Sequence, residues 1–485
     1  MKSKVIVGRK EELQRLEKVY LSKEAEFVVM YGRRRVGKTH LIREHFKKKQ
    51  CVFFHATGIQ KGKLKVQLTH FSEELSRTFT AGNLPIQTPT SWEDAFKQLD
   101  YFINNQAEKK EKTVIFLDEL PWMATPKSGL LEALDYYWNR HWSQNKRVVL
   151  IVCGSSAAWL IKKIIYNQGG LHNRCTCEIK LAPFTLKETS EYLKNIGVKL
   201  NNAHILSLYM VFGGVPYYLK HVNAGLSASQ NIQKILFDKN APLADEFNKL
   251  FASLFKDADD YIELIEIISR RSGGMSRSEI EANVRLSKSG GRLTLKLNDL
   301  IQTNFLEHFI PWTRERGEFY KVIDEFSLFY MRWLANKKQK NILKDYWLKQ
   351  SSKPTYYAWA GYAFEAVCHK HINNVIKALH IKTAESVSSW RFIERKAESQ
   401  GAQIDLLIDR SDDAITVCEI KYTTKPFAID KAYARNLENK VAILRERTRT
   451  KKEIFIALIS ANGLKENQNS EGLISSVVVL DDLFC

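Results

Sequence analysis

One stretch of eight residues decides the fold of this chain: Gly32-Arg33-Arg34-Arg35-Val36-Gly37-Lys38-Thr39. It satisfies the pattern G-x-x-x-x-G-K-[ST] at every fixed position. An apolar run at residues 27–31 leads into it, and a helical pattern at residues 39–46 follows it. This context favours phosphate binding, because free backbone N–H groups and the helix dipole attract anions at the loop. We therefore expect Lys38 to reach the β and γ phosphates of ATP and the Thr39 hydroxyl to bind Mg²⁺.

A pair of acids follows a second apolar run. Residues 114–117 read as a buried strand, and Asp118 and Glu119 come directly after them. Open α/β sheets place their ligand chemistry at the carboxyl ends of the strands. The spacing predicts that Asp118 supports the Mg²⁺ shell and that Glu119 orients the attacking water. The alternative is that both acids merely cap the next helix.

Two further segments are candidates for the same site. Residues 147–156 form another buried strand that ends in Ser155 and Ser156, either of which could contact the γ-phosphate or the water. A plain strand-to-loop turn explains these serines equally well. Arg174 lies in a glycine-containing loop and is a candidate arginine finger or sensor, although exposed loop arginines usually have no such role. Together with Asp118 and Ser155, the whole loop from Gly32 to Thr39 forms the predicted ATP-binding set.

Composition narrows the classes of protein. The chain of 485 residues has a formal net charge of +20, which favours binding to polyanions such as DNA. A generally basic, solvated surface is the alternative explanation. Apolar runs stay well short of the roughly 18 residues that a membrane span needs, and residues 1–7 lack the apolar core of a signal peptide. Seven scattered cysteines indicate reduced thiols. We expect a cytoplasmic protein without a membrane partner.

The middle of the chain predicts three helices and a hairpin. Residues 258–271 and 292–303 carry apolar residues at helical spacing, and Ser276 with Glu279 forms a capping box between them. Residues 304–312 and 319–323 read as two strands. This order is that of a winged helix, which binds DNA in some proteins and serves as an interaction module in others. A lysine-rich stretch, residues 336–355, then reads as a linker.

The C-terminal part brings acids and a lysine together. Residues 401–408 and 415–422 predict a hairpin with Asp405 on one strand and Glu419 and Lys421 on one face of the other. Glu365, on a helix upstream, can join them. Carboxylate oxygens are the ligands that Mg²⁺ prefers, and a lysine can polarise a water against a phosphodiester. An ordinary charged hairpin is the alternative.

Two family resemblances follow from these motifs. Residues 1–255 resemble the archaeal and bacterial ATPases of the AAA+/STAND type, which implies a Rossmann-like core with a helical lid that senses nucleotide. Glu365, Asp405 and Glu419-Ile420-Lys421 resemble the PD-(D/E)xK nucleases, which implies metal ligation by the three acids and catalysis by Lys421. The motifs that carry the first resemblance are Gly8-Arg9, Gly32 to Thr39, Asp118-Glu119, Gly154-Ser155-Ser156, Asn173-Arg174 and Phe212-Gly213-Gly214-Val215-Pro216-Tyr217-Tyr218-Leu219.

The sequence thus predicts an α/β chain with an N-terminal P-loop ATPase core and a C-terminal restriction-endonuclease-like domain. We expect an ATP-dependent, Mg²⁺-using enzyme that acts on DNA. The alternatives are an ATP-switched binding module whose nuclease fold does not cleave, and an ATPase partner of a larger complex or homo-oligomer. The expected segments are the core at 1–185, the lid at 186–255, the winged helix at 256–335, the linker at 336–355 and the nuclease-like domain at 356–485.

Overall fold

A computed structural model describes most of the chain, and its Cα positions divide into two units, Met1–Pro183 and Phe184–Cys485. We refer to them as unit 1 and unit 2 and describe each by itself. The boundary lies two residues before the predicted end of the ATPase core. The described residues are 6–82, 86–105, 112–166, 169–271, 273–285, 290–310, 312, 317–335, 345–392 and 401–485.

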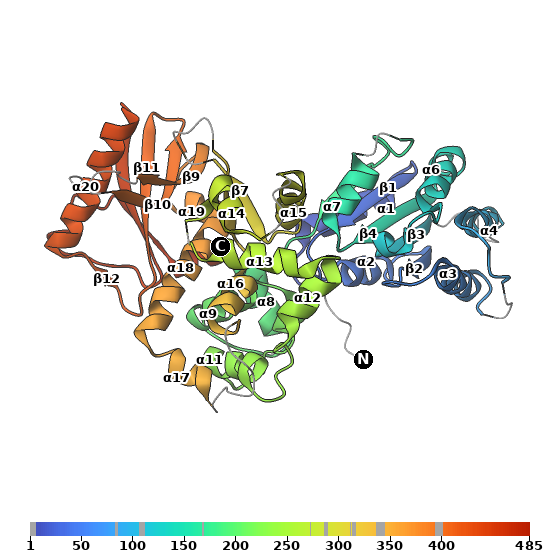
Figure 1. The fold of residues 1–485 in the computed structure, drawn as a ribbon, viewed down its shortest axis with the longest axis horizontal. Coiled ribbons are helices and arrows are strands. Elements are labelled where there is room, and N and C mark those ends of the chain that lie inside the picture. The colour runs from blue at the N-terminus through green and yellow to red at the C-terminus, as the bar shows by residue number, and fades with distance from the viewer. Residues whose placement is uncertain are drawn as a thin grey trace. The chain divides into compact units, whose positions relative to one another are not determined.

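Unit 1 is built on a five-stranded parallel sheet (Figure 1). The strands lie in the order β2-β3-β4-β1-β5, so the strand that precedes the phosphate loop is flanked by β4 and β5. The continuous apolar runs of the sequence form these strands because both faces of the sheet are covered. The bounds are β1 (Glu26–Tyr31), β2 (Cys51–Thr57), β3 (Lys112–Asp118), β4 (Val148–Gly154) and β5 (Cys177–Lys180).

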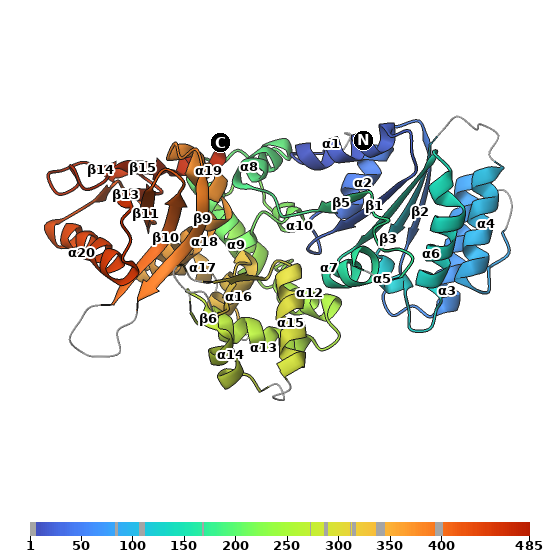
Figure 2. The same cartoon turned by 90° about the horizontal axis from the view of Figure 1, so that it is seen from above.

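Helices cover both faces of this sheet, and alternate residues of β1 show it. Phe27 and Val29 belong to the core under one set of helices, whereas Val28 and Met30 belong to the core on the other side. Figure 2 shows α3, α4 and α6 together on one side. The main helices are α1 (Lys10–Leu21), α2 (Lys38–Phe46), α3 (Leu64–Phe79), α4 (Trp92–Asn104) and α6 (Leu130–Arg140), with short α5 (Leu120–Met123) and α7 (Ala157–Leu160).

Unit 2 begins with a group of helices in the segment predicted to be the lid, residues 186–255. Gly213 adopts a left-handed φ of 60° and ends α9, and Pro216 occupies the first turn of α10. One helix thus stops and the next begins at this turn, as a glycine C-cap followed by a proline favours. These helices are α8 (Leu186–Asn195), α9 (Asn202–Phe212), α10 (Pro216–Leu219), α11 (Ala228–Ile232) and α12 (Glu246–Leu254).

Three helices and a small antiparallel sheet follow. The capping box of Ser276 and Glu279 is present at the start of α14. A short strand, β6, precedes that helix and joins the hairpin in the order β6-β8-β7, which the sequence did not indicate. The tip of the hairpin, residues 313–316, lies outside the described residues. The elements are α13 (Ala258–Ser269), β6 (Met275–Ser276), α14 (Arg277–Asn283), α15 (Gly290–Gln302), β7 (Leu306–Phe309), β8 (Phe319–Val322) and α16 (Glu325–Trp333).

The C-terminal part contains a mixed five-stranded sheet in the order β15-β13-β11-β10-β9. β9, β10 and β11 are antiparallel neighbours, whereas β11, β13 and β15 run parallel. Cys418 and Ile420 of β11 pack in the core that includes α18, whereas Ile415 and Val417 pack in the core that includes Leu444 of α20. Figure 1 shows these helices with the sheet. The bounds are α18 (Pro354–Lys370), α19 (Ile372–Ala378), β9 (Ala384–Phe392), β10 (Ala402–Arg410), β11 (Ala414–Lys421), α20 (Lys431–Thr448), β13 (Glu453–Ser460) and β15 (Ser476–Val479).

One hydrophobic core runs through unit 2 from Phe184 to Leu483. The predicted linker contributes to it from Asp345 onward, since α17 (Tyr346–Gln350) buries Trp347. The indole of Trp347 stacks on Phe237 at 5.5 Å and packs edge-on against Phe329 at 5.0 Å. This segment is thus part of the core, because burial of one large aromatic side chain contributes more to packing than its lysines contribute to solvation. In the described part of the chain, no helix is long and apolar enough to cross a membrane.

Candidate functional site

The phosphate loop of unit 1 encloses a buried cation. Lys38 Nζ donates to the carbonyl oxygens of Gly32 at 2.9 Å and Arg33 at 3.0 Å, and the side chain is almost fully buried. Gly37 has φ 97° and open space where a side chain would begin. A buried ammonium held by neutral carbonyls, beside an open glycine, fits a polyphosphate, which would supply the missing negative charge.

Only glycine fits at the start of the loop, because a larger residue would clash with its surroundings. A Cβ at Gly32 would lie 2.2 Å from the carbonyl oxygen of Leu181, which follows β5. The backbone N–H of Leu181 donates to the carbonyl of Tyr31 at 2.8 Å and fixes this approach. The remaining loop positions have separate surroundings: Arg33 and Val36 are buried, Arg34 lies 5.5 Å from the Trp122 ring, and Arg35 adopts φ 75°.

The loop helix and the acid after β3 are in direct contact. The Thr39 hydroxyl donates to Asp118 Oδ2 at 2.7 Å, although the two residues are 79 positions apart. His55 of β2 lies 3.7 Å from the same oxygen. Burial by itself raises the pKa of the Asp118 carboxyl, but hydrogen bonds from His55 and Thr39 outweigh it and hold that pKa below its ordinary value. Asp118 is thus kept as a carboxylate at neutral pH.

Glu119 and Ser155 meet across neighbouring strands. Glu119 Oε2 accepts hydrogen bonds from the backbone N–H of Ser155 at 3.0 Å and from its hydroxyl at 2.9 Å. Glu119 itself has a left-handed φ of 49°, which turns the chain sharply after β3. The structure therefore brings five predicted residues to the carboxyl edge of the sheet: Lys38, Thr39, Asp118, Glu119 and Ser155.

Arg174 lies elsewhere. It precedes β5, whose residue Cys177 pairs with Val28, and Thr176 donates from its backbone to the Phe27 carbonyl. The side chain of Arg174 is exposed near the amino end of the strands. β1 is six residues long, so about 20 Å of strand separates this end from the phosphate loop. Within its own unit, the structure does not bring Arg174 to the loop.

The C-terminal hairpin places Asp405 opposite Glu419. Leu406 pairs with Cys418, and Asp405 Oδ2 accepts from the backbone N–H of Ile420 at 3.2 Å. Lys421 Nζ lies 3.0 Å from Glu419 Oε1, so the two side chains share a face as the strand period predicts. The second strand of the hairpin thus presents an acid and a lysine beside Asp405.

Residues from α20 complete the surroundings of Glu419. Lys440 Nζ lies 2.8 Å from Glu419 Oε2, and the Tyr433 hydroxyl donates to Oε1. Burial alone would raise the pKa of Glu419, yet Lys421 and Lys440 hold it below its ordinary value. Burial, with the charges of Glu419 and Glu365, raises the pKa of Asp405 to about 6. The two carboxylates therefore differ in how readily each is ionised.

Glu365 comes from α18, on the face of the sheet opposite α20. Its carboxylate pairs with Lys321 Nζ of β8 at 3.2 Å. Farther along α18, His369 Nε2 lies 3.0 Å from the backbone carbonyl of Asp405. Burial lowers the pKa of His369 to about 4, with a contribution from Lys321. Among the described residues, no cluster of three or more His, Cys, Asp or Glu side chains is arranged to hold a metal ion.

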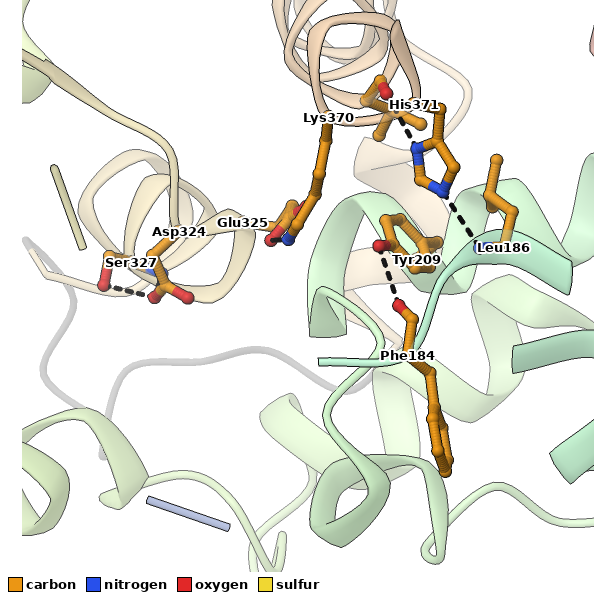
Figure 3. Close-up of polar contacts among 9 residues, drawn as sticks. Phe184, Leu186, Tyr209, Asp324, Glu325, Ser327, Lys370 and His371 are labelled. Atoms are coloured by element: carbon orange, nitrogen blue, oxygen red, sulfur yellow. Dashed lines mark hydrogen bonds and ion pairs between the residues drawn. The ribbon is translucent and has the colours of Figure 1, made fainter. Parts of the chain in front are cut away.

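The C-terminal end of α18 is tied to the start of unit 2 (Figure 3). The backbone N–H of Leu186 donates to His371 Nε2 at 3.0 Å, which leaves Nδ1 to donate to the Val367 carbonyl at 2.9 Å. Lys370 Nζ donates to both oxygens of the buried Glu325 carboxylate, at 2.7 and 2.9 Å. One helix thus carries Glu365 and also anchors the segment by which unit 2 begins.

The glycine pair after α9 packs against the same network. The Tyr209 hydroxyl donates to the Phe184 carbonyl at 2.9 Å, and the Phe184 N–H donates to the Gly214 carbonyl at 2.8 Å (Figure 3 labels Tyr209 and Phe184). A Cβ at Gly213 would lie 2.4 Å from Glu325 Oε2, and one at Gly214 would lie 2.1 Å from the Phe184 oxygen. The pair is therefore glycine because neighbouring groups occupy the space.

Sequence reasoning missed four side chains of these sites. His55 stands two residues before the end of β2 at the carboxyl edge, a position that could have been inferred from strand order. Tyr433 and Lys440 are seven residues apart, which puts them on one helix face. For Lys321, 44 residues from its partner Glu365, we find no local signal.

Unit 1 has the fold and the loop of a P-loop nucleoside triphosphatase. Residues 6–222 match the family model described as an ATPase domain predominantly from Archaea. Through these residues the chain belongs to that family.

Two relatives come from Methanocaldococcus jannaschii. The uncharacterized protein MJECL04 is 25% identical over 425 residues, which are 86% of this chain and 88% of the relative. The uncharacterized ATP-binding protein MJ0423 is 46% identical over 46 residues, which are 10% of this chain and 78% of the relative. Similarity to the first extends through both units.

Two solved structures are similar to part of this chain. The Walker-type ATPase PABY2304 of Pyrococcus abyssi gives a TM-score of 0.46 at 15% identity, covering 67% of this chain and 96% of its own. The ORC2 protein of Aeropyrum pernix, solved with ADPNP and ADP, gives a TM-score of 0.44 at 14% identity, covering 72% and 96%.

Proposed function

We propose that this chain hydrolyses ATP to control its engagement with DNA and acts on phosphodiesters through a Mg²⁺-dependent site in unit 2. One observation carries the first part: the 2.7 Å contact between the Thr39 hydroxyl and Asp118. It joins the phosphate loop to the acid pair at the edge of the sheet where parallel α/β folds bind their ligands.

Five side chains have roles in this proposal. Lys38 exchanges its loop carbonyls for the β and γ phosphates, and Thr39 with Asp118 holds the hydrated Mg²⁺. ATP supplies the phosphoryl group that is transferred to water. Glu119 orients that water, and Ser155 fixes the carboxylate of Glu119 through two hydrogen bonds. Arg174 lies at the other end of the strands and cannot reach the phosphate loop of its own unit. We therefore propose that it acts as an arginine finger only at the ATP site of a neighbouring copy in a homo-oligomer.

The experiment that tests this part compares ATP binding with ATP hydrolysis. Lys38→Ala is expected to abolish binding. Glu119→Gln is expected to keep binding and lose hydrolysis, because only the orientation of water is lost. Ser155→Ala removes one of two hydrogen bonds and is expected to reduce the rate less than Glu119→Gln. Hydrolysis by Glu119→Gln at the wild-type rate would contradict the role of Glu119.

The region from α13 to β8 has the element order of a winged helix, and we assign it that fold. Its third helix offers little free positive charge, however. Arg292 lies 3.0 Å from Asp260 and 3.5 Å from Asp257, and the buried Lys296 lies 3.0 Å from Asp260. A helix whose cations already face acids gains less from phosphates. We therefore propose that DNA contacts other basic surfaces of unit 2.

For the site in unit 2, we propose that Asp405 and Glu419 hold Mg²⁺, with Glu365 of α18 as the third predicted acid and Lys421 acting on the water. The donor set fits, because hard carboxylate oxygens suit Mg²⁺ and a cation would favour the ionised form of Asp405. Metal titration and DNA cleavage are measured for Asp405→Ala, Glu419→Ala and Lys421→Ala. The acid variants are expected to lose metal binding, whereas Lys421→Ala is expected to keep the metal and lose rate.

A second candidate function is a binding module that does not cleave. The arrangement around Glu419 favours it, because Lys421, Lys440 and Tyr433 already occupy both carboxylate oxygens. Wild-type protein that binds DNA but cleaves no single-stranded, duplex or branched DNA with Mg²⁺ or Mn²⁺, with and without ATP, would establish this alternative.

A further inference from the structure

A cavity of about 460 Å³ lies in unit 2 among α13, β8, α16 and α18. Its volume falls within the range of sites that hold one small ligand, roughly 300–1,000 Å³. Glu365 and Lys321 are part of its lining. The cavity therefore shares Glu365 with the predicted set of metal-binding acids.

One face of α18 forms a wall of this cavity. Trp359, Tyr362, Glu365 and their alanine neighbours recur at helical spacing along that face. The alanines leave space, whereas Trp359 is buried and packs against Phe329 at 5.4 Å. Tyr362 and Glu365 are one turn apart, so a ligand on the tyrosine lies beside the acid.

Tyr362 is unusual for its exposure. The side chain is 58% exposed although it stands on a helix whose other aromatic residue in the cavity, Trp359, is only 7% exposed. An exposed aromatic ring in a cavity wall offers a planar surface, and nucleobases stack on such rings without regard to sequence.

Positive charge predominates around this ring. Four cationic and two acidic side chains are found among the described lining residues: Arg270, Arg271, Lys321 and Arg332 against Glu266 and Glu365. Arg270 pairs with Glu266, and both side chains are more than half exposed. Arg271 is half exposed, but its partner Glu279 is only 36% exposed and also caps α14. Because an exposed pair contributes little to stability, Arg270 can turn to another anion at small cost. Arg332 is exposed on α16.

From this arrangement we infer that the cavity binds one nucleotide unit of a single nucleic-acid strand. Tyr362 stacks on the base, and Arg332, with the arginines that end α13, holds the phosphate. The inference rests on the proposed function, because it names the substrate form that reaches Glu365. A paired base would not fit this role, since both of its faces are covered by neighbours in a duplex.

The test measures binding of a 12-nucleotide single strand labelled at one end, by fluorescence anisotropy, with the full chain in EDTA so that nothing is cleaved. Tyr362→Ala and Arg332→Ala are each expected to weaken binding roughly tenfold. Tyr357→Ala is a matched control, since Tyr357 is 40% exposed on α18 but does not line the cavity. Lys377→Ala, at an exposed lysine of α19, is the control for lost charge.

Equal binding by the two cavity variants and the two controls would overturn the inference, as would equal affinity of wild type for blunt duplex and single strand. Unlabelled AMP, tested as a competitor on the Lys38→Ala chain, separates the two sources of a nucleotide unit. Competition by AMP that Tyr362→Ala abolishes assigns the cavity to a free nucleotide, and no competition assigns it to the strand.

Two combinations of results separate this inference from the proposed cleavage. If wild type cleaves no DNA yet the cavity variants lose binding, the cleavage proposal fails and the nucleotide site stands. If DNA is cleaved and the cavity variants bind and cleave normally, the nucleotide site is refuted.

Discussion

Lys38 is a buried ammonium with loop carbonyls as its partners. A buried charge without an acid is unfavourable for folding, so its place in the loop serves a ligand and not stability. Lys38→Met is expected to melt at the same temperature as wild type or higher without nucleotide. It is also expected to lose the stabilisation by ATP and Mg²⁺, which is about 2.7 kcal/mol at a hundredfold excess over Kd.

Differential scanning calorimetry with and without ATP and Mg²⁺ measures both effects. Lys47→Met removes an exposed lysine just after α2 and is expected to keep the nucleotide shift. A Lys38→Met protein that melts well below wild type without ATP would show that Lys38 stabilises the loop itself.

At the scale of an element, the turn between α9 and α10 gives a sharper comparison. Gly214 (φ 70°) and Gly225 (φ 80°) both have left-handed backbones, but a Cβ at Gly225 would meet no atom within 4 Å. Gly225→Ala is expected to lower the free energy of unfolding by about 1–2 kcal/mol, solely because alanine disfavours the left-handed backbone conformation. Gly214→Ala adds a clash with the Phe184 carbonyl and is expected to cost about 3 kcal/mol or more. Urea unfolding measures both, and equal losses would contradict the close packing.

The junction of α18 with α19 predicts an acid-sensitive element. Burial, with Lys370 nearby, lowers the pKa of His371, although its bond to Val367 and the charge of Glu325 act the other way. The unfolded chain therefore takes up a proton that the folded chain resists, and stability is lost as pH falls below the ordinary value of about 6.5. Protonated His371 also cannot accept from the Leu186 N–H.

His371→Gln is expected to flatten this loss in urea unfolding between pH 7.5 and 5, at a cost of about 1 kcal/mol at pH 7.5. The partly exposed His204 provides the control, since His204→Gln should follow the wild-type slope. A wild-type slope in His371→Gln would assign the acid sensitivity to other groups.

At the scale of the whole molecule, the net charge of +20 predicts how binding responds to salt. Counterion release makes affinity for a polyanion fall with ionic strength, and we expect a loss of about a decade or more between 50 and 200 mM salt. Anisotropy titrations with single-stranded and duplex DNA measure this slope. A flat dependence would indicate that the surplus charge serves protein partners or no partner.

The sequence anticipated those elements whose signals are local. The apolar runs of β1, β3 and β4 and the acidic hairpin are all read from a few adjacent residues. β5 was missed because it has four residues and two of them are charged. Lys440 reaches Glu419, and Lys321 reaches Glu365, only after distant elements pack, so no pattern in one window contains them. Arg174 shows the opposite case, a motif residue whose strand direction places it away from the loop.

The continuous core of unit 2 has a consequence for inheritance. The family match ends at residue 222, and the predicted last segment begins at residue 356, yet both boundaries cut through a core that runs from Phe184 to Leu483. Separating the pieces would expose Trp347, Trp359 and their neighbours. We therefore expect a gene fission at either point to yield products with an exposed core, and residues 184–485 to be inherited as one block.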